Sequence, residues 1–302
     1  MCAPQVVVAI GETHEHSLPA RNLKAADFRV SAAGKSARVT SSELWQNPSG
    51  RVVILLDMSG SMAPAVGSDR WTIARAMALA FVTWAPPKEQ IWLLTFNDAV
   101  QQRFGPSNEH KAIEDWLNDP SVREGKENKG RTAELQAISA ANKALSPPQP
   151  GDAIYIITDG GDNFSKVSAA QVERELFDSG TRLFAYLLYD KYMSAEEQRI
   201  GLDGLIILSQ ESGGFIVSQA ANFRLPYTTD DLFKLGPKVM REMQDTTVAI
   251  QGIISRFYLL TIEGVEPSLK PKPWTIELVD ERGHKWKNLT LTYPRRPAAC
   301  GQ

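Results

Sequence analysis

An uninterrupted aliphatic run that ends in an acid is the feature that most constrains how this chain can fold. Residues 52–56 read Val-Val-Ile-Leu-Leu, and Asp57 follows directly. Consecutive apolar residues without polar alternation are typical of a strand that is covered on both faces, as in a parallel sheet between helices. Such a strand would deliver Asp57 to the carboxyl end of the sheet, where ligands bind in open α/β folds.

The composition is that of a folded chain with balanced charge. Of its 302 residues, 43% are hydrophobic and 23% are charged, which suits one large domain or one domain with a smaller module. Lys and Arg number 33 against 35 Asp and Glu, for a formal net charge of -2. We therefore expect neither nucleic acid nor an anionic membrane as a partner.

Neither a membrane span nor a signal segment is predicted. No apolar run has the length needed to cross a bilayer, and residues 6–10 are too short and too weakly flanked for a secretory signal. Cys2 and Cys300 lie at opposite ends of the chain. They are either unrelated thiols or a bridge that joins the termini, and two cysteines alone do not define the redox compartment.

Strand-like runs alternate with helical patterns between Val52 and Phe215. Ser168 with Gln171 predicts a capped helix that Gly180 ends, and Ser194 with Glu197 predicts another. The pattern predicts an α/β fold, a Rossmann-like doubly wound and mostly parallel sheet with one antiparallel edge strand. The expected strands cover 51–57, 91–97, 99–104, 153–159, 182–189 and 215–219, and the expected helices cover 70–84, 109–117, 133–145 and 169–178, with one more ending near 211–214.

Both ends of the chain have β character without crossover helices. Turn signals at 33–35 and 281–283 separate alternating segments, and lone hairpins are marginally stable in water. We therefore expect residues 4–48 and 254–294 to pair into one antiparallel β module. A helix from about Thr229 to Ser255, with a kink at Pro237, would lead into it. The predicted division is residues 1–49 and 255–302 for the β module, 50–228 for the α/β domain and 229–254 for the connecting helix.

Three loops at the carboxyl end of the predicted sheet supply oxygen donors. In an extended loop Asp57, Ser59 and Ser61 point to one side, and Gly60 permits a tight turn between the serines. Thr132 opens a helix, and Asp159 follows another strand. Two carboxylates and three hydroxyls suit Mg²⁺ first, with Mn²⁺ or Ca²⁺ as alternatives, and the set lacks the His and Cys that favour zinc.

These residues resemble the metal-ion-dependent adhesion site of von Willebrand factor A domains. That family's Asp-x-Ser-x-Ser motif, its distant Thr and its later Asp match Asp57, Ser59, Ser61, Thr132 and Asp159, and the likeness covers residues 50–222. A narrower likeness, to the bacterial VWFA-related family described from acidobacteria, extends along the chain. Members of that family usually carry secretion signals, so it implies a secreted or periplasmic protein, with a cytoplasmic one as the alternative. The chain departs from the usual pattern after Thr132, where relatives more often have a second Gly and an Asp.

The resemblance implies a protein-binding module rather than an enzyme. Two carboxylates leave a bound Mg²⁺ under-neutralised, with one open position that a partner's Asp or Glu can fill. Of nearby residues, Asp162 is expected to cap a helix or to be solvated rather than to support the site, and Thr158 is expected to pack or to bond locally. The charged run 123–131 is either a solvated loop or a rim that selects acidic partners.

Two other functions stay open at this stage. One is a structural scaffold with a vestigial metal site. The other is a metal-dependent phosphoryl hydrolase with Asp57 as nucleophile. A phosphatase of that type would carry a second acid two residues on, where this chain has Ser59, and the sequence also has no Walker loop or Gly-x-Ser-x-Gly elbow. The oligomeric state is not indicated.

Overall fold

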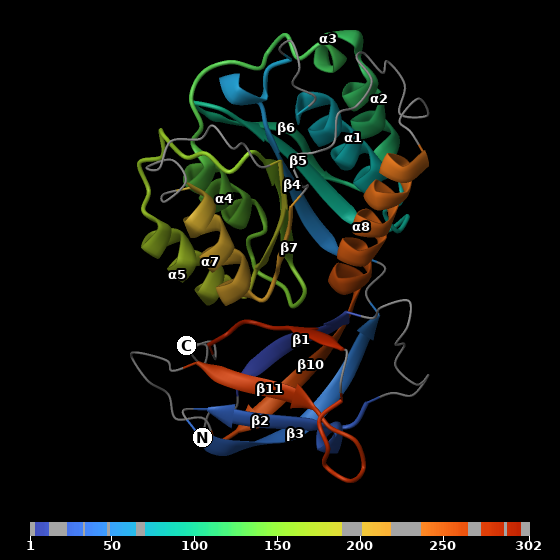
Figure 1. The fold of residues 1–302 in the computed structure, drawn as a ribbon, viewed down its shortest axis with the longest axis vertical. Helices are drawn as coiled ribbons and strands as arrows, with labels where there is room; N and C mark the ends of the chain where they lie inside the picture. Colours follow the sequence, from blue (N-terminus) through green and yellow to red (C-terminus); the bar gives the residue numbers. More distant parts are fainter. Residues whose placement is uncertain are drawn as a thin grey trace.

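The chain folds into two units, which Figure 1 shows one above the other, joined by helix α8. The computed structural model describes residues 4–11, 23–32, 34–46, 49–64, 70–188, 201–218, 237–264, 273–286 and 289–296. The middle of the chain forms the α/β unit, and the two ends form the β unit.

The α/β unit is built on a sheet of six described strands in the order β6-β5-β4-β7-β8-β9. All neighbours are parallel except β5 and β6, which form the predicted antiparallel hairpin. The predicted α/β fold with one antiparallel edge strand is therefore confirmed. The strands are β4 (Arg51–Asp57), β5 (Gln90–Phe96), β6 (Val100–Ser107), β7 (Ala153–Thr158), β8 (Arg182–Leu187) and β9 (Ile216–Ser218).

Helices cover both faces of this sheet. Along β4, Val52, Ile54 and Leu56 pack into the core under α1, α2 and α8, while Val53 and Leu55 face the core under α4, α5 and α7. Burial on both faces explains why the strand has no polar alternation. The helices are α1 (Arg70–Thr83), α2 (His110–Asn118), α3 (Pro120–Arg123), α4 (Glu134–Ala144), α5 (Ala169–Ser179), α7 (Asp203–Ser212) and α8 (Pro237–Ser255).

Local signals set the ends of α5 as predicted. The Ser168 hydroxyl accepts a hydrogen bond from the Gln171 backbone N–H at 3.2 Å, and Gly180 adopts a left-handed φ of 69° at the other end. The second predicted cap, Ser194 with Glu197, lies outside the described residues, as do Cys2 and Cys300. The described part of α8 begins at Pro237, and the expected start near Thr229 also falls outside it.

The β unit is a sheet of six described strands in the order β11-β2-β3-β10-β1-β12, all antiparallel. The N- and C-terminal segments therefore pair as predicted. The strands are β1 (Gln5–Gly11), β2 (Phe28–Ala32), β3 (Lys35–Gln46), β10 (Arg256–Glu263), β11 (Trp274–Leu278) and β12 (Thr290–Thr292), and short 3-10 turns occur at Ala25–Asp27 and, in the other unit, Gly60–Met62.

The sheet of the β unit curls around its own core. The Trp274 backbone N–H, at the start of β11, donates to the Arg295 carbonyl just after β12, so the two outer strands approach one another. The predicted antiparallel β module is therefore a single curled sheet. The predicted turn at 281–283 is present, but β12 pairs with β1 rather than with β11. The core residues include Val8, Val30, Leu260 and Ile276.

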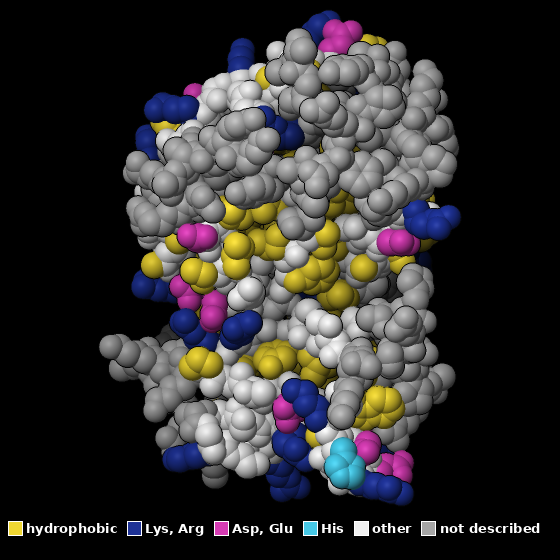
Figure 2. Space-filling model, in the orientation of Figure 1, with side chains coloured by type: hydrophobic (Ala, Val, Ile, Leu, Met, Phe, Trp, Pro, Cys, Tyr) yellow, Lys and Arg dark blue, Asp and Glu magenta, His cyan; other side chains and the backbone are white. Residues whose placement is uncertain are grey.

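The units meet through apolar and charged contacts. Figure 2 shows hydrophobic side chains gathered across the middle of this face, at the level of the junction. Beyond β12, the Arg296 guanidinium lies 3.0 Å from the Glu173 carboxylate on α5. None of the described helices has the length and hydropathy that a membrane span requires.

Candidate metal-binding site

Backbone hydrogen bonds hold the loop after β4 against its neighbours at the carboxyl edge of the sheet. The Met58 N–H donates to the Phe96 carbonyl at 2.8 Å, and the Gly60 N–H donates to the Gly130 carbonyl at 3.0 Å. A Cβ atom on Gly60 would lie 3.1 Å from that carbonyl oxygen, so the close approach favours glycine. Two of the predicted loops are thereby fixed to one another.

The Asp57 carboxylate is buried and oriented from two sides. Its Oδ1 accepts from the Ser59 N–H at 2.8 Å, and its Oδ2 accepts from the Thr158 hydroxyl at 2.7 Å. Thr158 ends the adjacent strand β7, and its hydroxyl also accepts from the Gly160 N–H at 3.0 Å. The sequence predicted a local bond for Thr158 but not this link between two predicted ligand loops.

The two serines lie together beside this acid. The Ser59 and Ser61 hydroxyl oxygens are 3.0 Å apart, although residues 60–62 form a 3-10 turn and not the extended loop that was expected. Burial, and then the negative charge of Asp159, raise the pKa of Asp57 to about 7. Two neighbouring buried acids with a pair of hydroxyls form a donor set that suits a hard divalent cation.

Arg70 supplies a positive charge to this cluster. Its guanidinium Nη1 lies 3.0 Å from Asp159 Oδ2, and the Arg70 side chain is partly exposed, whereas the Asp159 side chain is buried. Sequence reasoning missed this residue, because it lies at the start of α1, far along the chain from its partner. The ion pair offsets part of the repulsion between the two acids.

The Thr132 loop packs against the loop that follows β7. Its N–H donates to Asn163 Oδ1 at 2.9 Å, and its carbonyl accepts from the Asn163 and Phe164 N–H groups. Asp162 accepts from the Leu135 N–H at 3.0 Å, so it satisfies an N–H group in the first turn of α4 from a separate loop, while the N-cap position itself is Ala133. These bonds bring the helix start toward Asp159, although they run through the backbone of Thr132 rather than its hydroxyl.

The residues present fit a site with few carboxylates. In the part of the chain that the structure describes, no three His, Cys, Asp or Glu side chains are grouped closely enough to hold a metal ion. The predicted set, with two carboxylates and three hydroxyls, does not require such a group. Asp57, Ser59, Ser61, Thr132 and Asp159 therefore stay the predicted ligands.

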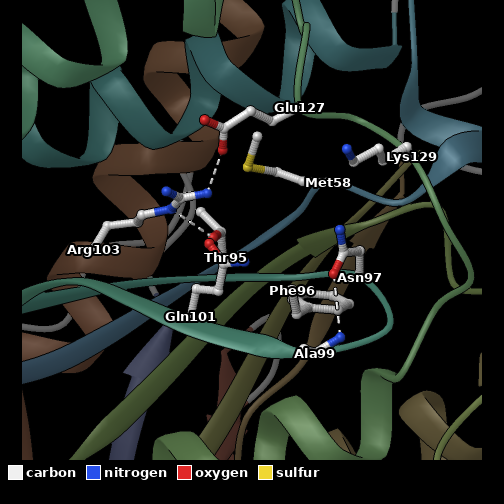
Figure 3. A pocket seen from close by; sticks show the side chains of 9 residues that line it. All are labelled: Met58, Thr95, Phe96, Asn97, Ala99, Gln101, Arg103, Glu127 and Lys129. Atoms are coloured by element: carbon white, nitrogen blue, oxygen red, sulfur yellow. Dashed lines mark hydrogen bonds and ion pairs between the residues drawn. The ribbon is translucent and has the colours of Figure 1, made fainter.

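A polar pocket of about 340 Å³ adjoins the site, since Met58 lies in its wall (Figure 3). Arg103 extends across the pocket from β6, donates to the Thr95 hydroxyl at 3.0 Å and pairs with Glu127 at 2.5 Å. The Lys129 ammonium points toward the same space. The walls are made by Met58, Thr95, Phe96, Asn97, Ala99, Gln101, Arg103, Glu127 and Lys129.

The fold and the edge cluster define a doubly wound α/β domain with oxygen donors at its carboxyl edge, and comparison with known proteins assigns it to a family. Residues 52–161 match the family model of the von Willebrand factor type A domain. This segment of the chain therefore matches the von Willebrand factor type A domain that the Asp-x-Ser-x-Ser motif indicated. No curated protein matches the sequence significantly.

Solved structures resemble the chain in fold at low sequence identity. An aerotolerance-related membrane protein from Bacteroides fragilis is 18% identical, with a TM-score of 0.50 over 68% of this chain and 98% of that one. The protein BatB from Bacteroides thetaiotaomicron is 16% identical, with a TM-score of 0.45 over 65% of this chain and 99% of that one. A von Willebrand factor type A protein from Catenulispora acidiphila is 13% identical, with a TM-score of 0.48 over 99% of this chain and 74% of that one.

Arg70 is predicted to compete with a bound cation. In Arg70→Gln the positive charge beside Asp159 is lost, so we expect Mg²⁺ affinity to rise several-fold and the melting temperature of the Mg²⁺-free protein to fall. Titration calorimetry and thermal unfolding in chelator measure the two effects. Arg174→Gln, at an exposed position on α5, is the matched control and should change neither. A fall in Mg²⁺ affinity in Arg70→Gln would instead show that Arg70 orients Asp159 for the metal.

Proposed function

We propose that this protein is a non-enzymatic module that binds another protein through a divalent cation. Von Willebrand factor type A domains typically mediate protein interactions and are generally not enzymes, which supports the general class. The observation that carries the finer proposal is the arrangement of Asp57, buried and oriented by Ser59 and Thr158, beside the paired hydroxyls of Ser59 and Ser61.

The proposed cation is Mg²⁺, with Mn²⁺ or Ca²⁺ as alternatives. Asp57, Ser59, Ser61, Thr132 and Asp159 would hold it, directly or through water. With only two carboxylates the cation keeps a net positive charge and one position for an Asp or Glu of the partner. A charge-assisted bond of this kind, in partly desolvated surroundings, is stronger than an ordinary contact at the rim of an interface.

The pocket beside the site supports an acidic partner. Lys129 is exposed. Among the lining residues, the two positive charges of Arg103 and Lys129 outnumber the single negative charge of Glu127. A cationic wall next to the metal position would favour a partner segment with several acids and speed its association. By analogy with the secreted VWFA-related family, we propose a secreted or periplasmic location.

Asp57→Ala tests the proposal. Mg²⁺ should raise the melting temperature of the unchanged protein, because a cation that binds only the folded state stabilises it. The shift should disappear in Asp57→Ala and persist in Asp178→Ala, an exposed acid on α5. The absence of any Mg²⁺ shift in the unchanged protein would favour the scaffold with a vestigial site.

The role of the partner's carboxylate needs a second measurement. The protein should retain a short immobilised peptide with a central Glu in Mg²⁺, release it in chelator, and ignore the same peptide with Gln. Equal retention of both peptides in Mg²⁺ would contradict a metal-bound carboxylate while leaving metal binding itself intact.

A further inference from the structure

Glu134 is a buried acid beside the predicted metal site. It is the first residue of α4, two positions after Thr132, and its side chain is fully buried. Neither of its carboxylate oxygens has a hydrogen-bond partner within the described residues. Burying an acid without hydrogen-bond partners destabilises the folded state, so its presence requires an explanation such as a bound water or ion.

The charges that act on Glu134 are negative. Burial first, and then the charges of Asp162, Asp57 and Asp159, raise the pKa of Glu134 well above its usual value. Two of these three acids are predicted metal ligands. The Thr158 hydroxyl acts in the opposite direction, but its only proton goes to Asp57.

Nearby positive and polar groups are already engaged elsewhere. Arg70 pairs with Asp159, and the Leu135 N–H, next to Glu134 in the first turn of α4, donates to Asp162. The Glu134 carboxylate therefore faces a cluster of negative charge with no counter-charge of its own among the described contacts.

We propose that Glu134 is a positioning residue of the metal site, whose carboxylate accepts hydrogen bonds from water molecules that are bound to the cation. The inference rests on the proposed cation site. Water mediates the contact because no three acids in the described chain converge closely enough to coordinate one ion. Since the Glu134 side chain is fully buried at the start of α4, it would act from the protein side of the site and leave the outward position to the partner's carboxylate.

The proposal predicts opposite effects on stability and on metal binding. Glu134→Gln keeps the shape and removes the charge, and Glu134→Leu removes the polar group as well. Both should raise the melting temperature of the protein in chelator, because an unpaired buried acid is gone. Both should weaken Mg²⁺ binding, by roughly tenfold or more, which is the scale of losing a group that orients a metal's ligands.

Glu89 offers a matched control within the same chain. It is also fully buried, and neither of its oxygens has a partner among the described residues. It precedes β5, at the amino end of the sheet, whereas the metal site lies at the carboxyl end. Glu89→Gln should therefore raise the melting temperature in chelator and leave the Mg²⁺ affinity unchanged.

Titration calorimetry with Mg²⁺ on the full chain, together with thermal unfolding in chelator, decides the matter. Weaker Mg²⁺ binding in Glu134→Gln but not in Glu89→Gln supports the proposal. Equal Mg²⁺ affinity in the unchanged protein and Glu134→Gln overturns it and leaves the cation site standing. No Mg²⁺ binding to the unchanged protein overturns both. If Glu134→Leu does not fold, the isosteric Glu134→Gln alone gives the answer.

Discussion

Arg182→Met is expected to lower the free energy of unfolding by about 3–5 kcal/mol, the scale on which breaking a buried charged group's interactions destabilises a protein. Arg182 begins β8 and is fully buried. Its Nη1 donates to the Ile253 carbonyl at 2.9 Å, and its Nη2 donates to the carbonyls of Gly151 at 3.0 Å and Ile254 at 3.1 Å.

Two of these three bonds join β8 to α8, the helix that leads into the β unit, and the third stays within the α/β unit. Ile253 and Ile254 lie in the last turn of α8, where helix carbonyls lack partners within the helix and a positive charge is favoured. The guanidinium also lies 5.2 Å from the ring centre of Phe257, the second residue of β10, and 5.4 Å from that of Phe184. Burial lowers the pKa of Arg182 to about 10, so the charge is still present at neutral pH.

Methionine would fill the space but leave three buried carbonyls without a donor. Urea unfolding at pH 7 measures the loss, and Arg174→Met, at an exposed position on α5, should change the free energy by about 0.5 kcal/mol or less. Arg182→Lys should restore less than half, because an ammonium cannot reproduce the planar fork of donors. A loss below about 1 kcal/mol in Arg182→Met would mean that water satisfies the carbonyls and that Arg182 is not what holds the end of α8 against the sheet.

The layers of the fold could be predicted from sequence because their signals are local. The unbroken run in β4, the helical spacing of α1 and the Ser168 cap each depend on residues a few positions apart. The strand order of the β unit depends on pairing between segments more than 200 residues apart, such as β1 with β10. Alternation predicted that these strands pair but could not select their neighbours, so the pairing of β12 with β1 was not foreseen.

The candidate site likewise contains residues that a local sequence signal identifies and contacts that only the folded chain shows. The Asp-x-Ser-x-Ser spacing is a local signal, and it identified Asp57, Ser59 and Ser61. Arg70 was missed, and so was the bond from Thr158 to Asp57, because these contacts exist only once separate loops meet at the sheet edge.

Glu134 did leave a signal in the sequence. It stands four residues before Ile138 and seven before Ala141, on the buried face of α4. An acid on an apolar helical stripe, beside a predicted metal ligand, is a departure from the pattern that points to function rather than to packing.

Glu89→Gln is expected to make the protein more stable at pH 8 by about 2–3 kcal/mol and to have little effect near pH 4. Burial raises the pKa of Glu89 from 4.5 to about 7. The folded state therefore keeps a proton that the unfolded chain releases, and stability falls as pH rises from about 4.5 to about 7. Glutamine carries no such proton, so this part of the pH dependence should disappear.

Urea unfolding of both proteins in chelator at pH 4, 6 and 8 tests this expectation, and the difference between them isolates Glu89 from other acids that titrate, including Asp57. The His110 ring lies 3.0 Å from the Glu89 backbone carbonyl and not from its carboxylate, so substituting the side chain leaves that contact in place. A difference that does not vary with pH would show that Glu89 keeps an ordinary pKa. If Glu89→Gln is more stable at pH 8 and keeps its Mg²⁺ affinity, then Glu89 destabilises the fold without taking part in metal binding. Glu134 should differ, because replacing it should weaken Mg²⁺ binding as well.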